Sequence, residues 1–305
     1  MATKNFSFTP SFKILLSLSL TLLVGCQSLQ RRSEVNGSGA AGKVESSDQI
    51  APPVYQDEQP APPVVTTEIP KIGLILGPGA LRAYAHIGVI EELSKLRAPI
   101  VAVTGIEMGA LVGAIYSNKG QPFDVEWQMM KIKDDDLVDR GNINDFMGMV
   151  FAKSRVESAK VPFACPALNM QKQQVFMMNR GAYTQMLPYC LSFPPLFKPF
   201  QNNVAGVLDL KTAVDYVHAK GATYVIYVNV LEGSTKLGKG DSEAQTLWSL
   251  AAHSLDRQKK TADLVIDVPL RDIELIDFKH RRDVIQRGRQ AGQQAAGQIS
   301  QRFGL

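Results

Sequence analysis

The fold is decided by residues 71–116, which read KIGLILGPGALRAYAHIGVIEELSKLRAPIVAVTGIEMGALVGAIY. Two short apolar runs, 72–76 and 100–103, are bounded by glycine or proline and are typical of buried strands. Each run is followed by a glycine-containing turn and then by apolar residues at helical spacing. This repeated order of strand, turn and helix predicts parallel strands with right-handed crossovers, and it places ligand sites at the carboxyl ends of the strands.

Later segments extend the same pattern. Residues 161–170 and 174–178 could pair as strands, and further strands are expected at 223–230 and 262–268. The charged, methionine-rich segment 121–160 gives a weaker pattern that is read as helical or lid-like. A basic, glutamine-rich helix is expected from His280 onward.

The first 69 residues differ in composition from the rest. Residues 1–25 carry two lysines, no acid, and an 11-residue run of apolar, Ser or Thr residues at 14–24. This run is too short to span a bilayer and fits an export signal. It ends in Leu-Val-Gly-Cys, which resembles the bacterial lipobox and implies that Cys26 is acylated. The glutamine that follows this cysteine favours the outer membrane of the cell envelope as the location.

Residues 26–69 are expected to form a tether, because this Gly-, Ser- and Pro-rich segment cannot bury enough apolar surface to fold. The remaining residues 70–305 are numerous enough for one large domain with its own core.

The 305-residue chain has a formal net charge of +4, of which Lys4 and Lys13 in the signal contribute two. This near-neutral balance gives no electrostatic case for nucleic-acid binding, and it implies that membrane attachment depends on the lipid at Cys26 rather than on a basic surface. Three cysteines are not a disulfide framework. Whether Cys165 and Cys190 approach each other stays open, with free thiols as the favoured interpretation. Four histidines without clustered spacing predict no metal site.

The two glycine turns are the segments that should carry chemistry. The first, at residues 77–89, lacks the third glycine of a dinucleotide motif, because Arg82 stands there. It therefore either aims backbone N–H groups at an oxyanion or is simply a tight turn. In the second turn, Gly105 and Gly109 flank position 107 with the spacing of a nucleophile elbow.

These segments together resemble the patatin-like phospholipases, and the resemblance spans about residues 70 to 300. The matching stretches are GPGALRAYAHIGVIEEL, GIEMGALVGAIY, VPFACPALNM, GAYTQMLPYCLSFPPLFKPF, GATYVIYVNV and ADLVIDVPLRDIELIDFKHRRDVIQRG. The resemblance implies a three-layer α/β/α fold with a mainly parallel central sheet. It also implies a Ser–Asp dyad that cleaves acyl esters of lipids, with no metal or other cofactor.

The sequence departs from the family at the dyad itself. The elbow serine is replaced by Glu107, and the aspartate position, counted back from GATYVIYVNV, is Ala205. The oxyanion loop, with Gly77, Pro78, Gly79 and Arg82, contains a proline that lacks an N–H group. We expect the Glu107 carboxylate to fill the former oxyanion site with its own charge. His86 is interpreted as a packed helix residue.

Three hypotheses follow. The first is a membrane-anchored, non-hydrolytic pseudoenzyme that binds a lipid or acyl ligand, or a protein partner. The second is an active lipid acyl hydrolase with a displaced dyad, for which Asp209 is the weak substitute, although this residue is better explained as a helix N-cap. The third is a purely structural envelope protein with a filled groove. Thr104 and Ser117 carry hydroxyl groups but lack the elbow geometry.

Overall fold

The computed structural model describes residues 68–137, 140–238 and 241–305. The described residues all belong to one compact unit. The expected signal at 1–25, the acylated Cys26 and all but the last two residues of the expected tether lie outside the described residues.

A seven-stranded sheet with the order β4-β3-β2-β1-β6-β7 forms the centre of this unit, and β5 also pairs with β3. The strands β1, β2, β3, β6 and β7 are parallel, whereas β4 and β5 pair with β3 in the antiparallel sense. The mainly parallel sheet and the pairing of 161–170 with 174–178 are thereby confirmed. The strands are β1 (Ile72–Leu76), β2 (Ile100–Gly105), β3 (Phe163–Asn169), β4 (Gln174–Met178), β5 (Asn203–Ala205), β6 (Tyr224–Asn229) and β7 (Leu264–Asp267).

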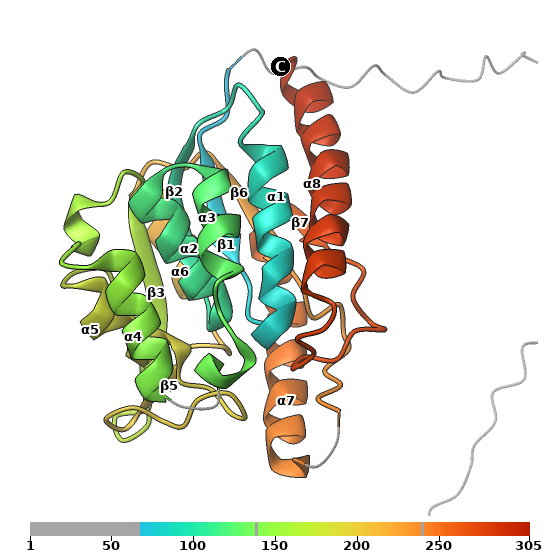
Figure 1. Ribbon diagram of the computed structural model, residues 1–305. Coiled ribbons are helices and arrows are strands. Elements are labelled where there is room, and N and C mark those ends of the chain that lie inside the picture. The colour runs from blue at the N-terminus through green and yellow to red at the C-terminus, as the bar shows by residue number, and fades with distance from the viewer. Residues whose placement is uncertain (1–67, 138–139, 239–240) are drawn as a thin grey trace, which may run out of the picture. The chain divides into compact units, whose positions relative to one another are not determined.

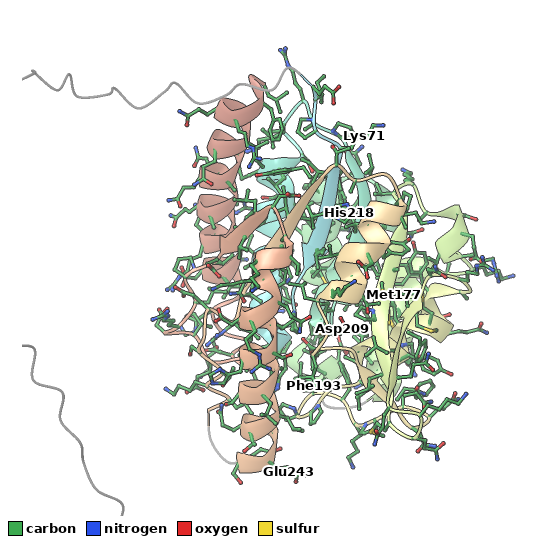
Figure 2. The ribbon with its side chains drawn as sticks, turned by 180° about the vertical axis from the view of Figure 1, so that it is seen from behind. Lys71, Met177, Phe193, Asp209, His218 and Glu243 are labelled. Atoms are coloured by element: carbon green, nitrogen blue, oxygen red, sulfur yellow. A yellow bond between two sulfur atoms is a disulfide. The ribbon has the colours of Figure 1, made fainter. Side chains whose placement is uncertain are left out.

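Helices cover both faces of the sheet and complete a three-layer α/β/α fold (Figure 1). Figure 1 shows α1 and α8 side by side on one face, and the view from behind in Figure 2 shows α6 and α7 on the other. The helices are α1 (Ala85–Leu93), α2 (Met108–Lys119), α3 (Pro122–Met129), α4 (Arg140–Phe151), α5 (Tyr183–Leu191), α6 (Lys211–Ala219), α7 (Ser242–Gln258) and α8 (Arg281–Phe303), and a 3₁₀ turn, η1 (Ala80–Tyr84), precedes α1. Further 3₁₀ turns are η2 (Asp134–Leu137), η3 (Val156–Ser158) and η4 (Lys259–Thr261).

The central strand β1 supplies apolar side chains to both layers of the core. Leu74 and Leu76 join the apolar cluster that includes α1, α2 and α8, whereas Ile75 joins the cluster beneath α6 and α7. This division follows from the two-residue period of a strand, which sends alternate side chains to opposite faces. Each of these fully buried side chains contributes about 2 kcal/mol to folding, so the apolar run anchors the turn that follows it.

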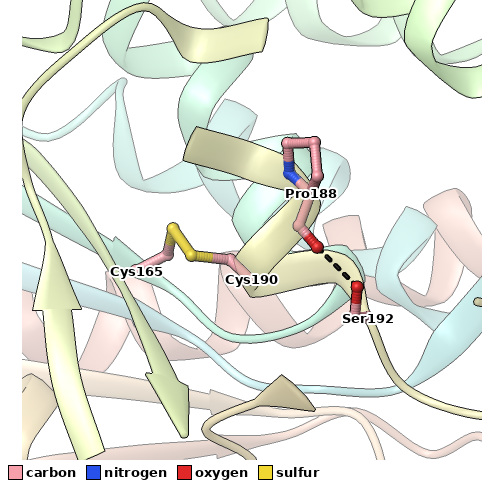
Figure 3. Close-up of a disulfide and its surroundings, with 4 residues drawn as sticks. All are labelled: Cys165, Pro188, Cys190 and Ser192. Carbon is pink, nitrogen blue, oxygen red and sulfur yellow. Dashed lines mark hydrogen bonds between the residues drawn. A yellow bond between two sulfur atoms is a disulfide. The ribbon is translucent and has the colours of Figure 1, made fainter. Parts of the chain in front are cut away.

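The favoured interpretation of Cys165 and Cys190 as free thiols, in a question that the sequence left open, is wrong. They form a disulfide that joins β3 to α5, with a Cα–Cα distance of 5.9 Å (Figure 3). Both residues are buried, as their apolar surroundings in the sequence indicated. A separation of 25 residues gave no indication of pairing, because the contact depends on how α5 docks against the sheet. Just after α5, the Ser192 hydroxyl donates to the Pro188 carbonyl at 2.5 Å.

For the segment 121–160 the sequence allowed either helices or a lid-like structure. This segment contains α3, η2 and α4. Helices α5 and α7 were not expected from the sequence. Within the described part of the chain, no helix combines the length and the apolar character needed to cross a bilayer.

Candidate functional site

The turn between β2 and α2 has the geometry of a nucleophile elbow. Glu107 lies at its apex with φ 54° and ψ −128°, immediately before the first residue of α2. A non-glycine residue rarely adopts this conformation, and it persists where the surrounding structure imposes it. The flanking glycines are required: a Cβ on Gly105 would lie 2.3 Å from the Gly109 carbonyl oxygen, and one on Gly109 would lie 2.5 Å from the Leu76 carbonyl oxygen.

The Glu107 side chain reaches the glycine loop that follows β1. Its Oε2 accepts hydrogen bonds from the backbone N–H groups of Ala80, at 2.8 Å, and Gly79, at 3.2 Å. The Leu81 N–H is engaged elsewhere by the Leu275 carbonyl, and Pro78 has no N–H group to offer. One carboxylate oxygen thus occupies two adjacent donors of the loop.

Burial dominates the electrostatics of Glu107, whose side chain is 0 % exposed. Loss of solvation raises its pKa to about 7, although hydrogen bonds from the backbone N–H groups of Met108, Ala80 and Gly79 act in the opposite direction. Its second oxygen, Oε1, has no hydrogen-bond partner among the described residues. The residue is therefore enclosed, and close to neutral pH it exchanges between a carboxylate and a carboxylic acid.

Two buried side chains hold the glycine loop in place. His86 Nε2 lies 2.8 Å from the Gly77 carbonyl, and burial lowers the pKa of this histidine to about 4, so it is neutral at physiological pH. The Arg82 guanidinium donates to the carbonyls of Ile273, Leu231 and Ser234. Burial also lowers the pKa of Arg82, to about 10, which leaves it charged. Arg82 therefore fastens the loop to neighbouring segments, and its five donors are not directed at Glu107.

Ala205 lies at the end of β5, opposite Ala167 of β3, and is buried. Its N–H donates to the Ser192 carbonyl at 2.9 Å. Ala205 belongs to the same apolar cluster as Ile106, the residue before Glu107. At this position the chain offers a methyl group, which can neither accept a proton nor orient a hydroxyl.

Asp209 is engaged at the start of α6. Its Oδ1 accepts the Thr212 backbone N–H at 3.0 Å and its Oδ2 accepts the Thr212 hydroxyl at 2.6 Å. This is a capping arrangement that satisfies a donor of the first helical turn. The helix itself begins at Lys211, with Leu210 in the capping position, so Asp209 caps from one residue further out. Both carboxylate oxygens are thus used within the same turn.

The hydroxyl groups of Thr104 and Ser117 are not presented at the elbow. Thr104 lies within β2, where it pairs with Ile75 of β1 and Ala164 of β3, and Ser117 lies near the far end of α2. Both are fully buried, and neither hydroxyl has a hydrogen-bond partner among the described residues.

Comparison with known proteins identifies the family to which this architecture belongs. A family model described as Patatin-like phospholipase matches residues 74–215, which contain the glycine loop, the elbow and β5. This chain belongs to the patatin-like phospholipase family. The patatin-like match ends in α6, so the family model covers the elbow side of the domain and leaves α7 and α8 outside.

The curated relatives are distant and longer than the shared region. An uncharacterized NTE family protein of Mycobacterium tuberculosis is 24% identical over 144 residues, which cover 43% of this chain and 40% of that protein. Lysophospholipase NTE1 of Coccidioides immitis is 24% identical over 202 residues, covering 59% of this chain but 13% of the fungal protein. Lysophospholipase NTE1 of Yarrowia lipolytica is 24% identical over 202 residues, with 58% and 14% covered.

The patatin-like domain has an apolar pocket of about 480 Å³ beside Ala205. Its walls come from β3, β5, the segment after α5 and the first half of α7, and they include Leu168, Phe193, Ala205, Val207, Leu208 and Leu247. Asp241 and Glu243 lie at the α7 end. Figure 2 shows Phe193 and Glu243 toward the same end of the molecule. Glu107 is not part of this lining, because it is enclosed by the glycine loop.

Sequence reasoning missed two features of this region. The pocket depends on α7, which was not expected, although the proline-rich apolar loop around Phe193 was visible in the sequence. Tyr227 lies on β6 with its hydroxyl buried against Gly77 and unpartnered among the described residues, and burial raises its pKa. Nothing in the strand pattern distinguishes this tyrosine. Within the described ranges, no three His, Cys, Asp or Glu residues gather as a ligand set for a metal.

Proposed function

We propose that this patatin-like protein is a lipid-anchored protein of the bacterial cell envelope that binds an acyl chain without hydrolysing it. The observation that carries the proposal is the Glu107 carboxyl on the elbow, with its Oε2 bound to the N–H groups of Gly79 and Ala80. The elbow and the loop persist, but the side chain between them is not a hydroxyl.

The chemistry of ester cleavage explains why this arrangement opposes catalysis. Acyl transfer requires a nucleophile activated by a nearby base, and attack by a carboxylate on an ester would give an anhydride. The developing oxyanion also needs free, preorganised donors. Here Glu107 already engages the Gly79 and Ala80 donors, and Ala205 supplies no base. A substrate carbonyl would have to displace the protein's own carboxyl group.

The apolar pocket beside Ala205 supports acyl binding. Its volume of about 480 Å³ lies within the range of small-molecule sites, and most of its lining residues are apolar. Phe193 packs edge-to-face on Trp248, with ring centroids 5.0 Å apart, and the Trp248 indole donates to the Pro194 carbonyl at 2.8 Å. These contacts fix the wall formed by the loop after α5. The carboxylates of Asp241 and Glu243 favour a ligand whose head group is neutral or zwitterionic.

Attachment to the envelope is proposed from the lipobox-like residues before Cys26. The disulfide between Cys165 and Cys190 supports an oxidising compartment outside the cytoplasm, where such bonds persist. Placement in the outer membrane extends this proposal, because glutamine follows Cys26. Labelling growing cells with radioactive palmitate tests the lipid attachment at Cys26. The chain should incorporate label, and Cys26→Ser should abolish incorporation and release the protein from the membrane fraction.

Acyl binding is tested with a fluorescent lysophosphatidylcholine, a zwitterionic probe with one acyl chain, and the purified full chain. We expect saturable binding, and mass spectrometry should recover the probe intact. Leu247→Arg should weaken binding at least tenfold, because it places a charge in the pocket wall. Met149→Arg is the matched control, since Met149 is an exposed apolar residue of α4 outside the pocket. Equal binding by both variants, or recovery of cleaved probe, would contradict the proposal.

A further inference from the structure

Basic residues are concentrated at the amino-terminal edge of the parallel strands. Every loop that leads into a parallel strand there carries at least one, and so do the ends of α2 and α8. The residues are Lys71 before β1, Lys95 and Arg97 before β2, Lys119 at the end of α2, Lys160 before β3, Lys220 before β6, Lys259 and Lys260 before β7, and Arg302 near the end of α8. We refer to these nine residues as the basic edge.

Several contacts place these separate segments side by side. The Lys160 ammonium donates to the Lys119 carbonyl at 2.7 Å, and the Lys71 carbonyl accepts the Thr223 N–H from the loop before β6. The Arg302 guanidinium lies over the ring of Tyr224, the first residue of β6, at 5.1 Å. Figure 1 accordingly shows the start of β1 beside the end of α8.

Most of this charge is not neutralised within the described chain. Lys95 pairs with Glu92 and Lys259 with Asp256, but the other seven residues of the basic edge form no ion pair with a described residue. Acidic residues are scarcer in the same loops: they are Glu68, Glu157 and Asp263. Glu157 pairs with Arg155, and Asp263 accepts the Val225 N–H. The edge is therefore strongly positive although the whole chain is nearly neutral.

The opposite edge differs. The loops after β6 and β7 contain the acids Glu232, Asp241, Asp272, Glu274 and Asp277. Of their described lysines and arginines, Arg271 pairs with Glu232 and Lys236 with Glu274, whereas Lys279 forms no ion pair with a described residue. The near-neutral total therefore hides a one-sided distribution. The sequence led us to expect that no basic surface contributes to membrane attachment, and this distribution leads us to revise that expectation.

Two large apolar side chains lie exposed beside the basic edge. Phe123, the second residue of α3, is 74 % exposed, and Ile69, two residues before Lys71, is 57 % exposed. Phe123 lies four residues after Lys119, the last residue of α2. Exposed aromatic and aliphatic side chains next to lysines are the combination that suits the boundary between headgroups and acyl chains.

We propose that the basic edge is a membrane-docking surface that binds the anionic headgroups of a lipid bilayer. Charge complementarity supports this occupant, and so does the path of the chain, because the described domain begins at Glu68 on this same edge. A chain acylated at Cys26 would join the domain at the face that the bilayer attracts. The proposal takes the anchor from the proposed function, but it depends neither on acyl binding nor on the lack of hydrolysis.

Docking at this edge also fixes the orientation of the pocket. Lys71 and Glu243 lie at opposite ends of the molecule in Figure 2, so the pocket beside Ala205 faces away from the bilayer that holds the basic edge. The ligand then reaches the pocket from the aqueous side, and is not drawn directly from the anchoring leaflet.

The test compares two triple variants with the same net charge. One carries Lys119→Glu, Lys220→Glu and Lys260→Glu at the basic edge, and the other carries Lys172→Glu, Lys236→Glu and Lys279→Glu in loops at the carboxyl ends of strands. Both are made in the full chain with Cys26→Ser, so that no attached lipid holds the protein. Binding is measured by co-sedimentation with vesicles of phosphatidylcholine, with or without phosphatidylglycerol, and circular dichroism verifies folding.

We expect the parent chain to prefer the anionic vesicles and to lose this preference as salt is raised. The basic-edge triple should bind them roughly 100-fold more weakly, from about fivefold for each lysine. The carboxyl-edge triple should stay within about twofold of the parent, since its charges lie far from the docked face. Equal losses in the two triples, or none in either, would overturn the proposal. So would binding of duplex DNA that is lost in the basic-edge triple while the vesicles fail to bind.

Discussion

Replacing Glu107 by glutamine should change how the stability of the domain depends on pH. Burial raises the pKa of Glu107 to about 7 from an ordinary value of 4.5. Between these two pH values, Glu107 is protonated in the folded state and ionised in the unfolded state. Its contribution to stability is therefore fully present below pH 4.5 and is lost as the pH rises through 7. The difference corresponds to about 3 kcal/mol.

His86 acts with the opposite sign. Burial lowers its pKa from 6.5 to about 4, so its contribution is present above pH 6.5 and is lost as the pH falls through 4. In the wild-type protein the two contributions largely cancel between about pH 4.5 and 6.5. Glutamine keeps an oxygen for the Gly79 and Ala80 donors but does not titrate, so Glu107→Gln should expose the His86 dependence.

The assay is urea unfolding of wild type and Glu107→Gln at a series of pH values, with the disulfide intact. The variant should gain about 3 kcal/mol relative to wild type between pH 4.5 and pH 8.5. Glu243→Gln is the control, because it removes one carboxylate from an exposed position. A stability difference between Glu107→Gln and wild type that stayed constant across this range would show that Glu107 does not have a raised pKa in the folded protein.

Three further changes test the scaffold. Gly105→Ala should lower the free energy of unfolding by about 3 kcal/mol in urea titrations, because its Cβ would lie 2.3 Å from a backbone oxygen, whereas Gly148→Ala, whose Cβ meets nothing within 4 Å, should not destabilise. Removing the disulfide with Cys165→Ala and Cys190→Ala should lower the free energy of unfolding by about 3 kcal/mol, measured against wild type under oxidising and reducing conditions. Equal stability of the two proteins under oxidising conditions would contradict this. Arg82→Met should cost about 3 kcal/mol or more in thermal or urea unfolding, because three backbone carbonyls lose their donor.

The parallel sheet was predictable because its strands are buried on both faces and therefore appear as continuous apolar runs. The expected strands at 72–76, 100–103, 223–230 and 262–268 all appear, with ends shifted by up to two residues. Helix α7 was missed although its buried residues, Ala244, Trp248, Ala251 and Leu255, recur at helical spacing. Helix α5 contains an internal proline at position 188, which weakens the helical pattern.

The elbow was predictable from Gly105 and Gly109, because their spacing reflects a steric requirement of the turn itself. The bond from Glu107 to a loop 27 residues earlier was expected from the family resemblance, whereas the particular donors needed coordinates. The disulfide and the basic edge were not predictable, since both depend on which distant segments the sheet brings together. Net charge, a sum over the chain, carries no information on that arrangement.

If Glu107 makes this patatin-like site non-hydrolytic, as we propose, fatty-acid release from a lysophospholipid is the most direct measurement of it. The purified full chain is incubated with this substrate and with a short-chain ester, alongside Glu107→Ala. Neither chain should release more fatty acid than heat-denatured protein does. Turnover by the wild type that Glu107→Ala abolishes would contradict the proposal, because Glu107 would then be a catalytic residue.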